Sequence, residues 1–126
     1  MVKAIHTEQA PAALGPYSQA IEAGDFLYVS GQIGIDPISG NVVNGIEGQT
    51  KQVLENIKAI LQEAGTDFSK AVKFTIYLKS MTDFATINEI YGSYLTEPYP
   101  ARATIEVSKL PKDVLVEMDV TVYTKA

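Results

Sequence analysis

Apolar and polar residues alternate along several stretches of the chain, and this alternation predicts strands. Between residues 72 and 79 every second side chain is apolar, which is the period of a β-strand. The same period recurs in residues 102–107 and 114–123. Residues 17–23 and 26–32 are strand-like runs separated by a glycine turn, so they are expected to pair as a hairpin.

Two other segments repeat their apolar residues with the period of an α-helix. In residues 49–64 these side chains fall on one stripe, and Gly65 directly afterwards is a favourable C-terminal stop. Residues 82–95 show the same pattern, with Thr82 as the expected N-cap and Pro98 shortly beyond the end. The sequence therefore predicts two helices separated by one strand.

The remaining residues complete the predicted topology. The turn-rich segment 36–41 leads into residues 42–43, which are expected to be a short third strand, and residues 1–15 are expected to be an irregular lead-in. The resulting order is β-β-β-α-β-α-β-β. For residues 1–126 it predicts a single α+β domain, in which one mixed six-stranded sheet carries two helices on one face.

Composition and charge exclude several kinds of chemistry. The chain contains no cysteine, which excludes disulfides, thiolate zinc sites and cysteine nucleophiles, and its single histidine, His6, cannot build a typical zinc site. A net charge of −5 without a basic cluster argues against nucleic-acid binding. Because the chain has no long apolar run, neither a signal peptide nor a membrane span is expected, and a cytoplasmic location is the default expectation.

The sheet face away from the helices is expected to be unusually apolar. If the helices cover the face that carries Val116, the opposite face still presents Tyr28, Leu115 and Tyr123. A partly apolar sheet face needs a cover, and the sequence contains no third layer. Another copy of the chain would provide this cover, so the sequence predicts a homo-oligomer.

Two charged residues interrupt the C-terminal strands. By alternation, Arg102 and Glu117 are both expected on the face away from the helices, where an oligomer interface would partly desolvate them. A planar guanidinium in such a place can hold a carboxylate with two hydrogen bonds. An ion pair between the two residues, or a position on a solvated rim, is the simpler explanation of the same pattern. Alternation alone does not decide between them.

Four segments of the chain carry a family resemblance. The strings are GPYSQAIEAGDFLYVSGQIGIDPISG (residues 15–40), NIKAILQEAG (56–65), FATINEIYGSYL (84–95) and PARATIEVSKLPKDVLVEM (100–118). In this order they resemble the Rid family of reactive-intermediate deaminases, also called the YjgF-like family. The resemblance extends over nearly the whole chain.

This resemblance implies a chorismate-mutase-like α+β fold and a homotrimer with clefts between its subunits. It also implies hydrolysis of small 2-imino acids, such as 2-iminobutanoate and 2-iminopropanoate, to 2-keto acids and ammonia. Pyridoxal-phosphate dehydratases release the enamines from which these imines form. A protonated imine is already electrophilic, so water can attack it directly, and no cofactor or metal is expected.

The resemblance assigns the two main catalytic roles to the charged residues of the C-terminal strands. Arg102 would bind the substrate carboxylate through charge-assisted hydrogen bonds. Glu117 would orient the attacking water and accept its proton as a general base.

Further residues are expected to complete the site. Backbone N–H groups near Gly31 and Thr104 would help to bind the carboxylate, and Tyr17 would enter the cleft from a neighbouring subunit. Ser30 and Asn88 are expected to line or support the cleft. Each has a purely structural alternative: packing for Tyr17, a strand bend for Ser30 and Gly31, and bracing of the second helix for Asn88.

One position departs from the family pattern. Many relatives have cysteine two residues after the arginine, where this chain has Thr104. A backbone contact at this position would survive the change, and the expected mechanism has no need of a thiol. Two other functions stay open: a regulatory trimer that binds small carboxylates such as keto acids without catalysis, and an RNA-acting protein, which the negative charge disfavours.

Overall fold

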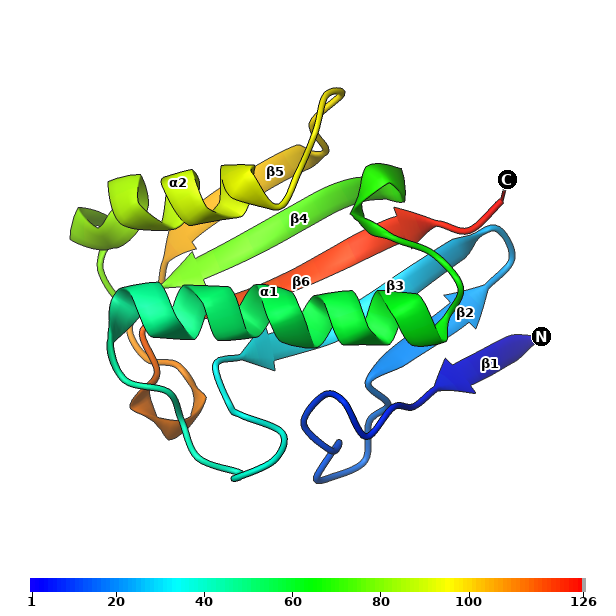
Figure 1. Cartoon of the computed structure of the whole chain (residues 1–126), viewed down its shortest axis with the longest axis horizontal. Helices are drawn as coiled ribbons and strands as arrows, with labels where there is room; N and C mark the ends of the chain where they lie inside the picture. Colours follow the sequence, from blue (N-terminus) through cyan, green and yellow to red (C-terminus); the bar gives the residue numbers. More distant parts are fainter. Residues whose placement is uncertain (126) are drawn as a thin grey trace.

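The computed structural model describes residues 1–125. They form a six-stranded mixed sheet with two helices on one face (Figure 1). The strands are β1 (Val2–Ile5), β2 (Ala20–Ala23), β3 (Phe26–Ile33), β4 (Ala71–Leu78), β5 (Ala101–Glu106) and β6 (Val116–Tyr123). The helices are α1 (Gly45–Glu63), α2 (Phe84–Ser93) and the short 3₁₀ turns η1 (Phe68–Lys70), η2 (Met81–Asp83) and η3 (Pro111–Asp113). The expected fold class is confirmed, and the order β-β-β-α-β-α-β-β is the expected one, although its first three strands are not the three that were expected.

The strands lie in the order β1-β2-β3-β6-β4-β5. Every neighbouring pair is antiparallel except β4 and β5, which are parallel. Parallel neighbours need a crossover connection, and α2 provides it by lying over the β4–β5 side of the sheet (Figure 1). This crossover brings α2 directly against the edge strand β5.

The hydrophobic core lies between α1, α2 and one face of the sheet. The predicted stripe of α1 is fully buried, and the sheet contributes Leu27, Phe74 and Met118 to the same cluster. The alternating residues of β6 that were expected under the helices are therefore placed correctly. Neither helix within residues 1–125 is long and apolar enough to cross a membrane.

Two details of the N-terminal half differ from expectation. The lead-in is not wholly irregular, because Val2–Ile5 forms β1 and pairs with β2 at the edge of the sheet. Only Ile5 of this strand is buried, so the segment has no alternation to reveal it. The expected strand at residues 42–43 is wrong: Val42 makes a single isolated bridge to Ile35, and α1 begins directly afterwards at Gly45.

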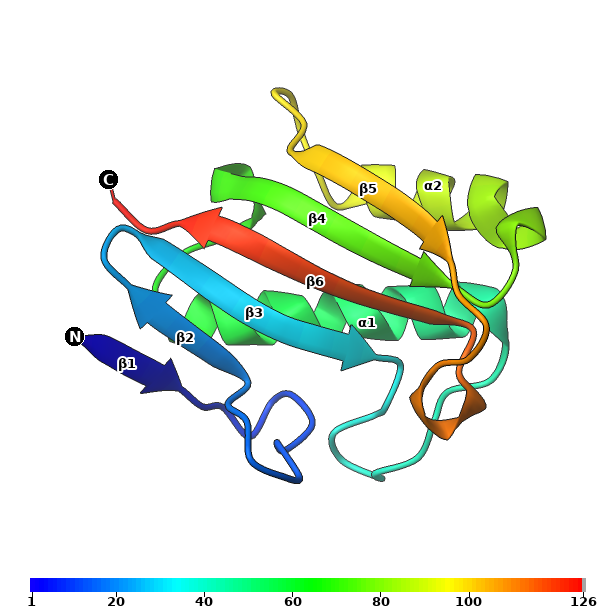
Figure 2. The same ribbon diagram turned by 180° about the vertical axis from the view of Figure 1, so that it is seen from behind.

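The opposite face of the sheet is open, as Figure 2 shows from behind. Tyr28 is 49% exposed there and Ile105 46% exposed, while the rings of Phe26 and Tyr123 pack edge to face with centroids 5.6 Å apart. The expectation of an uncovered, partly apolar face is confirmed for this chain. Such a face is typical of a surface that another protein layer covers.

Candidate functional site

Arg102 lies on the helix side of the sheet, which corrects the expectation that it shares the open face with Glu117. The β4–β5 register places Arg102 beside Phe74 and Thr104 beside Ile76, and both of these β4 side chains are buried beneath the helices. In adjacent strands, paired residues point to the same side. By the same register, Ile105 pairs with Tyr77 and faces the open side.

Residues of α2 surround the guanidinium of Arg102. Its Nη1 donates a hydrogen bond of 2.6 Å to Oδ1 of Asn88. Its central carbon lies 5.5 Å from the ring centroid of Phe84 and 5.1 Å from that of Tyr91. A cavity of about 520 Å³ opens beside these groups; its lining residues are Asn88, Tyr91, Gly92, Tyr99, Pro100 and Arg102. We call this cavity the arginine half-site.

Glu117 lies on the open face of the sheet. It is paired with Ile33 of β3 and Tyr77 of β4, and its side chain is half-buried. Burial raises the pKa of its carboxyl above the ordinary value of 4.5, and the neighbouring charge of Asp119 raises it further. Asp119 itself accepts a hydrogen bond of 3.0 Å from the Tyr77 hydroxyl. A carboxyl with a raised pKa is suited to accept a proton near neutral pH.

Gly31 makes room for the Glu117 carboxylate. The β3–β6 register shifts between Val29 and Gln32, so the expected irregularity at residues 30–31 is present as a bulge. A Cβ atom added to Gly31 would overlap the carboxylate and lie 3.0 Å from its carbon atom. Glycine at this position thus lets the carboxylate lie directly against the β3 backbone.

The segment around Tyr17 is fixed beside this carboxylate by buried polar contacts. The buried Gln19 accepts a 2.7 Å hydrogen bond from the N–H of Thr7 and donates one of 2.8 Å to the carbonyl of Pro11. Ser30 donates a 2.6 Å hydrogen bond to the carbonyl of Ser18. The Ser30 hydroxyl therefore supports the Tyr17 segment.

A second cavity, of about 420 Å³, lies between this segment and Glu117. Its walls include the apolar Leu14 and Ile33, the polar Gln19 and Gln32, and Tyr17, Gly31 and Glu117. Tyr17 is 53% exposed in the single chain. We call this cavity the glutamate half-site.

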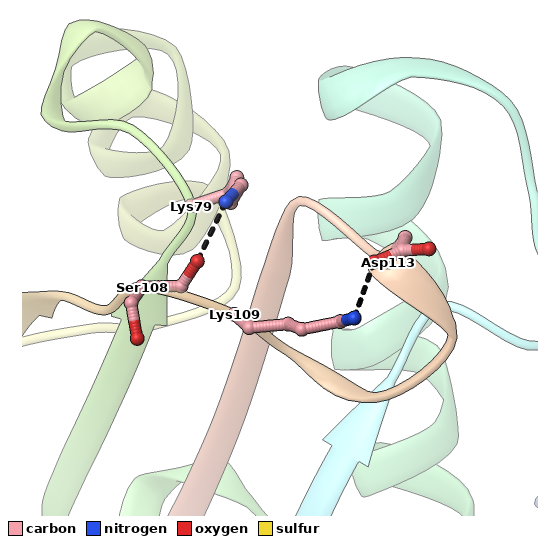
Figure 3. Close-up of polar contacts among 4 residues, drawn as sticks. All are labelled: Lys79, Ser108, Lys109 and Asp113. Atoms are coloured by element: carbon pink, nitrogen blue, oxygen red, sulfur yellow. Dashed lines mark hydrogen bonds and ion pairs between the residues drawn. The ribbon is translucent and has the colours of Figure 1, made fainter.

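The connection between β5 and β6 forms one rim of the glutamate half-site through Pro111 and Lys112. Lys112 and Asp113 have φ values of 55° and 54°, a left-handed conformation that is uncommon outside glycine. Figure 3 shows two contacts of this connection: Lys79 Nζ donates a 2.6 Å hydrogen bond to the Ser108 carbonyl, and the exposed Lys109 Nζ lies 4.0 Å from Asp113 Oδ1.

The structure thus divides the expected site residues into two groups. Arg102, Asn88 and Thr104 lie at or beside the arginine half-site on the helix side, and the Thr104 hydroxyl is buried without a hydrogen-bond partner within residues 1–125. The other group, Tyr17, Ser30, Gly31 and Glu117, lies at the glutamate half-site on the open side. One sheet separates the groups within a single chain.

Sequence reasoning missed the aromatic residues beside Arg102. The periodicity of residues 82–95 predicts Phe84, and either Ile90 or Tyr91, only as inward-facing apolar residues, because it does not distinguish a core contact from a contact with a cation. The i, i+4, i+7 spacing of Phe84, Asn88 and Tyr91 is the signal that could have grouped them on one helix face.

The raised pKa of Glu117 has a consequence for stability. A carboxyl whose pKa is higher in the folded than in the unfolded state destabilises the fold when ionised. Glu117→Gln is therefore expected to raise the melting temperature at pH 7. The difference in melting temperature between the variant and the wild type should shrink as the pH falls through the folded-state pKa of Glu117, and it should vanish below pH 4.5. Thermal melts from pH 4 to 8 measure this; a less stable variant at pH 7 would contradict it.

Comparisons with known proteins agree with this architecture. The family model described as endoribonuclease L-PSP matches residues 7–124. A 2-iminobutanoate/2-iminopropanoate deaminase from Salmonella typhimurium is 45% identical over 122 residues, which cover 94% of this chain and 95% of the relative.

Solved structures of related proteins have the same fold as this chain. RidA from an Antarctic Psychrobacter superimposes with a TM-score of 0.94 at 45% identity, over 96% of this chain and 98% of the other. Escherichia coli TdcF with bound serine superimposes with a TM-score of 0.93 at 37% identity, over 98% of this chain and 99% of TdcF. The chain belongs to the endoribonuclease L-PSP family, the group that includes the Rid proteins.

Proposed function

We propose that this protein is a 2-iminobutanoate/2-iminopropanoate deaminase, which hydrolyses small 2-imino acids to 2-keto acids and ammonia without a cofactor. Its active site would form between subunits of a homotrimer, where the arginine half-site of one subunit meets the glutamate half-site of the next. A cytoplasmic location is part of the proposal, because a chain without cysteine suits a reducing compartment.

The observation that carries the proposal is the separation of Arg102 and Glu117 on opposite faces of one sheet. Each half-site holds only part of the groups that imine hydrolysis needs. The arginine half-site has a cation for a carboxylate, and the glutamate half-site has a carboxyl of raised pKa. Contact between two copies through the open face would join the half-sites and cover the exposed aromatic residues there.

The proposed reaction begins with binding of the substrate carboxylate by Arg102. Its guanidinium has five N–H donors, and Asn88 accepts from one of them, so enough remain for a bidentate contact. Each charge-assisted hydrogen bond contributes about 1.5–3 kcal/mol. Backbone N–H groups near Gly31 and Thr104 would complete this binding.

Glu117 then activates the water. The water oxygen bonds to the carbon of the protonated imine while the C=N π bond breaks onto nitrogen and a water proton passes to the Glu117 carboxylate, which gives a 2-amino-2-hydroxy acid. Glu117 then returns this proton to the amino nitrogen, the C–N bond breaks with its electron pair on nitrogen, and ammonia leaves. Loss of the hydroxyl proton completes the C=O bond of the 2-keto acid. Tyr17, which lines the glutamate half-site, would close the cleft over these atoms.

Two relatives support the substrate class. The Salmonella relative bears the name of this deaminase, and the TdcF structure contains serine, an amino acid with the same carboxylate. The family model takes its name from an endoribonuclease. A net charge of −5 gives little attraction for a polyanion, so we expect no RNA binding even at low ionic strength.

A coupled assay tests the proposal. A threonine dehydratase supplies 2-iminobutanoate from threonine, and release of 2-ketobutyrate is followed with and without the protein. We expect faster release than the spontaneous rate. Measured binding of 2-ketobutyrate with no acceleration would instead favour a carboxylate-binding regulatory trimer. That outcome would refute the deaminase proposal, since it would show that the site forms and is not catalytic.

A further inference from the structure

The guanidinium of Arg102 has an unusual amount of aromatic contact for an exposed side chain. Its central carbon is within 6 Å of two ring centroids, those of Phe84 and Tyr91. That distance is the range in which a cation is attracted to the face of an aromatic ring. Arg102 is the only arginine in the chain, so this environment belongs to a single side chain.

The spacing of α2 explains how two rings reach one guanidinium. Phe84 and Tyr91 are seven residues apart, which places them on the same face of the helix and separates them by a rise of about 10.5 Å. The guanidinium carbon lies 5.5 Å from the ring centroid of Phe84 and 5.1 Å from that of Tyr91, so both rings of this face reach it. Asn88, one turn after Phe84, accepts a hydrogen bond from Nη1 of Arg102 through its side-chain oxygen. The guanidinium therefore contacts three residues of one helix face: Phe84, Asn88 and Tyr91.

The packing of the two rings makes this arrangement rigid. Tyr91 is 5% exposed and its ring packs edge to face against Phe74 of β4 at 5.1 Å. Phe84 is half-buried and packs against the core. Rings fixed in this way restrict the arginine side chain, which otherwise has many rotamers to lose when a ligand binds.

We propose that Phe84 and Tyr91 are positioning residues that hold the Arg102 guanidinium for the substrate carboxylate. This inference rests on the proposed function for its catalytic consequence. The two aromatic rings, with Asn88, fix the plane of the guanidinium before substrate binds, so that its remaining N–H donors point toward the cavity. We call the three residues Phe84, Asn88 and Tyr91 the arginine clamp.

The positioning role predicts which substitutions weaken ligand binding and hydrolysis. Phe84→Leu and Tyr91→Leu keep an apolar side chain and remove the ring, so each is expected to weaken 2-ketobutyrate binding and imine hydrolysis by roughly three- to thirtyfold. Phe84→Tyr and Tyr91→Phe keep the ring and should retain wild-type values. The Tyr91 hydroxyl is buried without a partner within residues 1–125, so its removal breaks no hydrogen bond there.

A matched control separates the clamp from general damage to α2. Tyr94 is the C-cap residue of α2; its ring packs edge to face against Phe68 at 5.9 Å, and its hydroxyl donates a 2.7 Å hydrogen bond to Glu55. Tyr94→Leu therefore removes an aromatic ring of the same helix region without touching the guanidinium. It should retain both binding and hydrolysis, even if its melting temperature falls.

The test uses the protein of residues 1–126 labelled with ¹⁵N-arginine, whose single arginine gives one Nε–H side-chain signal. In the wild type, the ring currents of Phe84 and Tyr91 should shift the NMR resonances of the guanidinium protons. Phe84→Leu and Tyr91→Leu should reduce this shift, whereas Tyr91→Phe and Tyr94→Leu should preserve it. 2-Ketobutyrate affinity and coupled imine hydrolysis are measured on the same samples.

The outcomes distinguish the two proposals. A wild type that accelerates no hydrolysis refutes the proposed function, and the guanidinium signal still reports on the clamp. If Phe84→Leu and Tyr91→Leu leave both the guanidinium signal and the affinity for 2-ketobutyrate unchanged, the proposed positioning role is wrong, whether or not the wild type hydrolyses imines. Equal losses in Tyr91→Phe and Tyr91→Leu would also overturn it, because they would assign the effect to the hydroxyl and not to the ring.

Discussion

Arg102→Ala is expected to abolish most of the acceleration of 2-keto acid release in the coupled assay. The substitution removes both hydrogen bonds of a bidentate, charge-assisted contact, so kcat/KM should fall by about 10²- to 10⁴-fold. Binding of 2-ketobutyrate should be lost with it, because the same contact holds product and substrate. The fold should persist, since Arg102 is exposed at an edge strand.

Two further variants make this expectation specific. Arg102→Lys keeps the charge but loses the planar fork, so it should recover only a small part of the activity. Lys51→Ala removes a cation from the exposed side of α1 and should leave the rate unchanged. An Arg102→Ala protein with an undiminished rate would exclude the role assigned to the guanidinium.

Glu117→Gln is expected to reduce kcat by about 10²- to 10⁴-fold while 2-ketobutyrate binding persists. The amide cannot accept the water proton, but it fills the same space against Gly31. Steady-state kinetics with parallel measurements of ligand binding would separate this variant from Arg102→Ala, which should lose both properties.

Asp119→Asn is the matched control for this variant. Asp119 lies on the same strand and face and contacts Tyr77, but it is not among the residues of either half-site. Its replacement should change the rate far less than that of Glu117. Equal rates for wild type and Glu117→Gln would rule out Glu117 as the general base.

The fold could be predicted from the sequence because its large elements bury one regular face. The stripe of α1 and the alternation of β4 and β6 mark their core positions directly. β1 escaped prediction because only one of its four residues is buried. Strands of this kind gain their stability from pairing with a neighbour, which local sequence does not record.

The residues of the site were easier to predict than their arrangement. Alternation in β5 divides its residues correctly into two sets, but it does not say which set lies under a helix. Ile105 is the apolar residue and Arg102 the charged one, yet Ile105 faces the open side and Arg102 faces α2. The crossover of α2 onto an edge strand decides this, and it is a property of tertiary structure.

The central claim is that Arg102 and Glu117 act together only across two subunits. The direct test is to co-refold equal amounts of Arg102→Ala and Glu117→Gln chains, each nearly inactive alone. Random mixing leaves about one quarter of the interfaces with an intact arginine half-site and an intact glutamate half-site, so about one quarter of wild-type activity should return. A mixture as inactive as its two components, in mixed oligomers verified by mass, would contradict the claim.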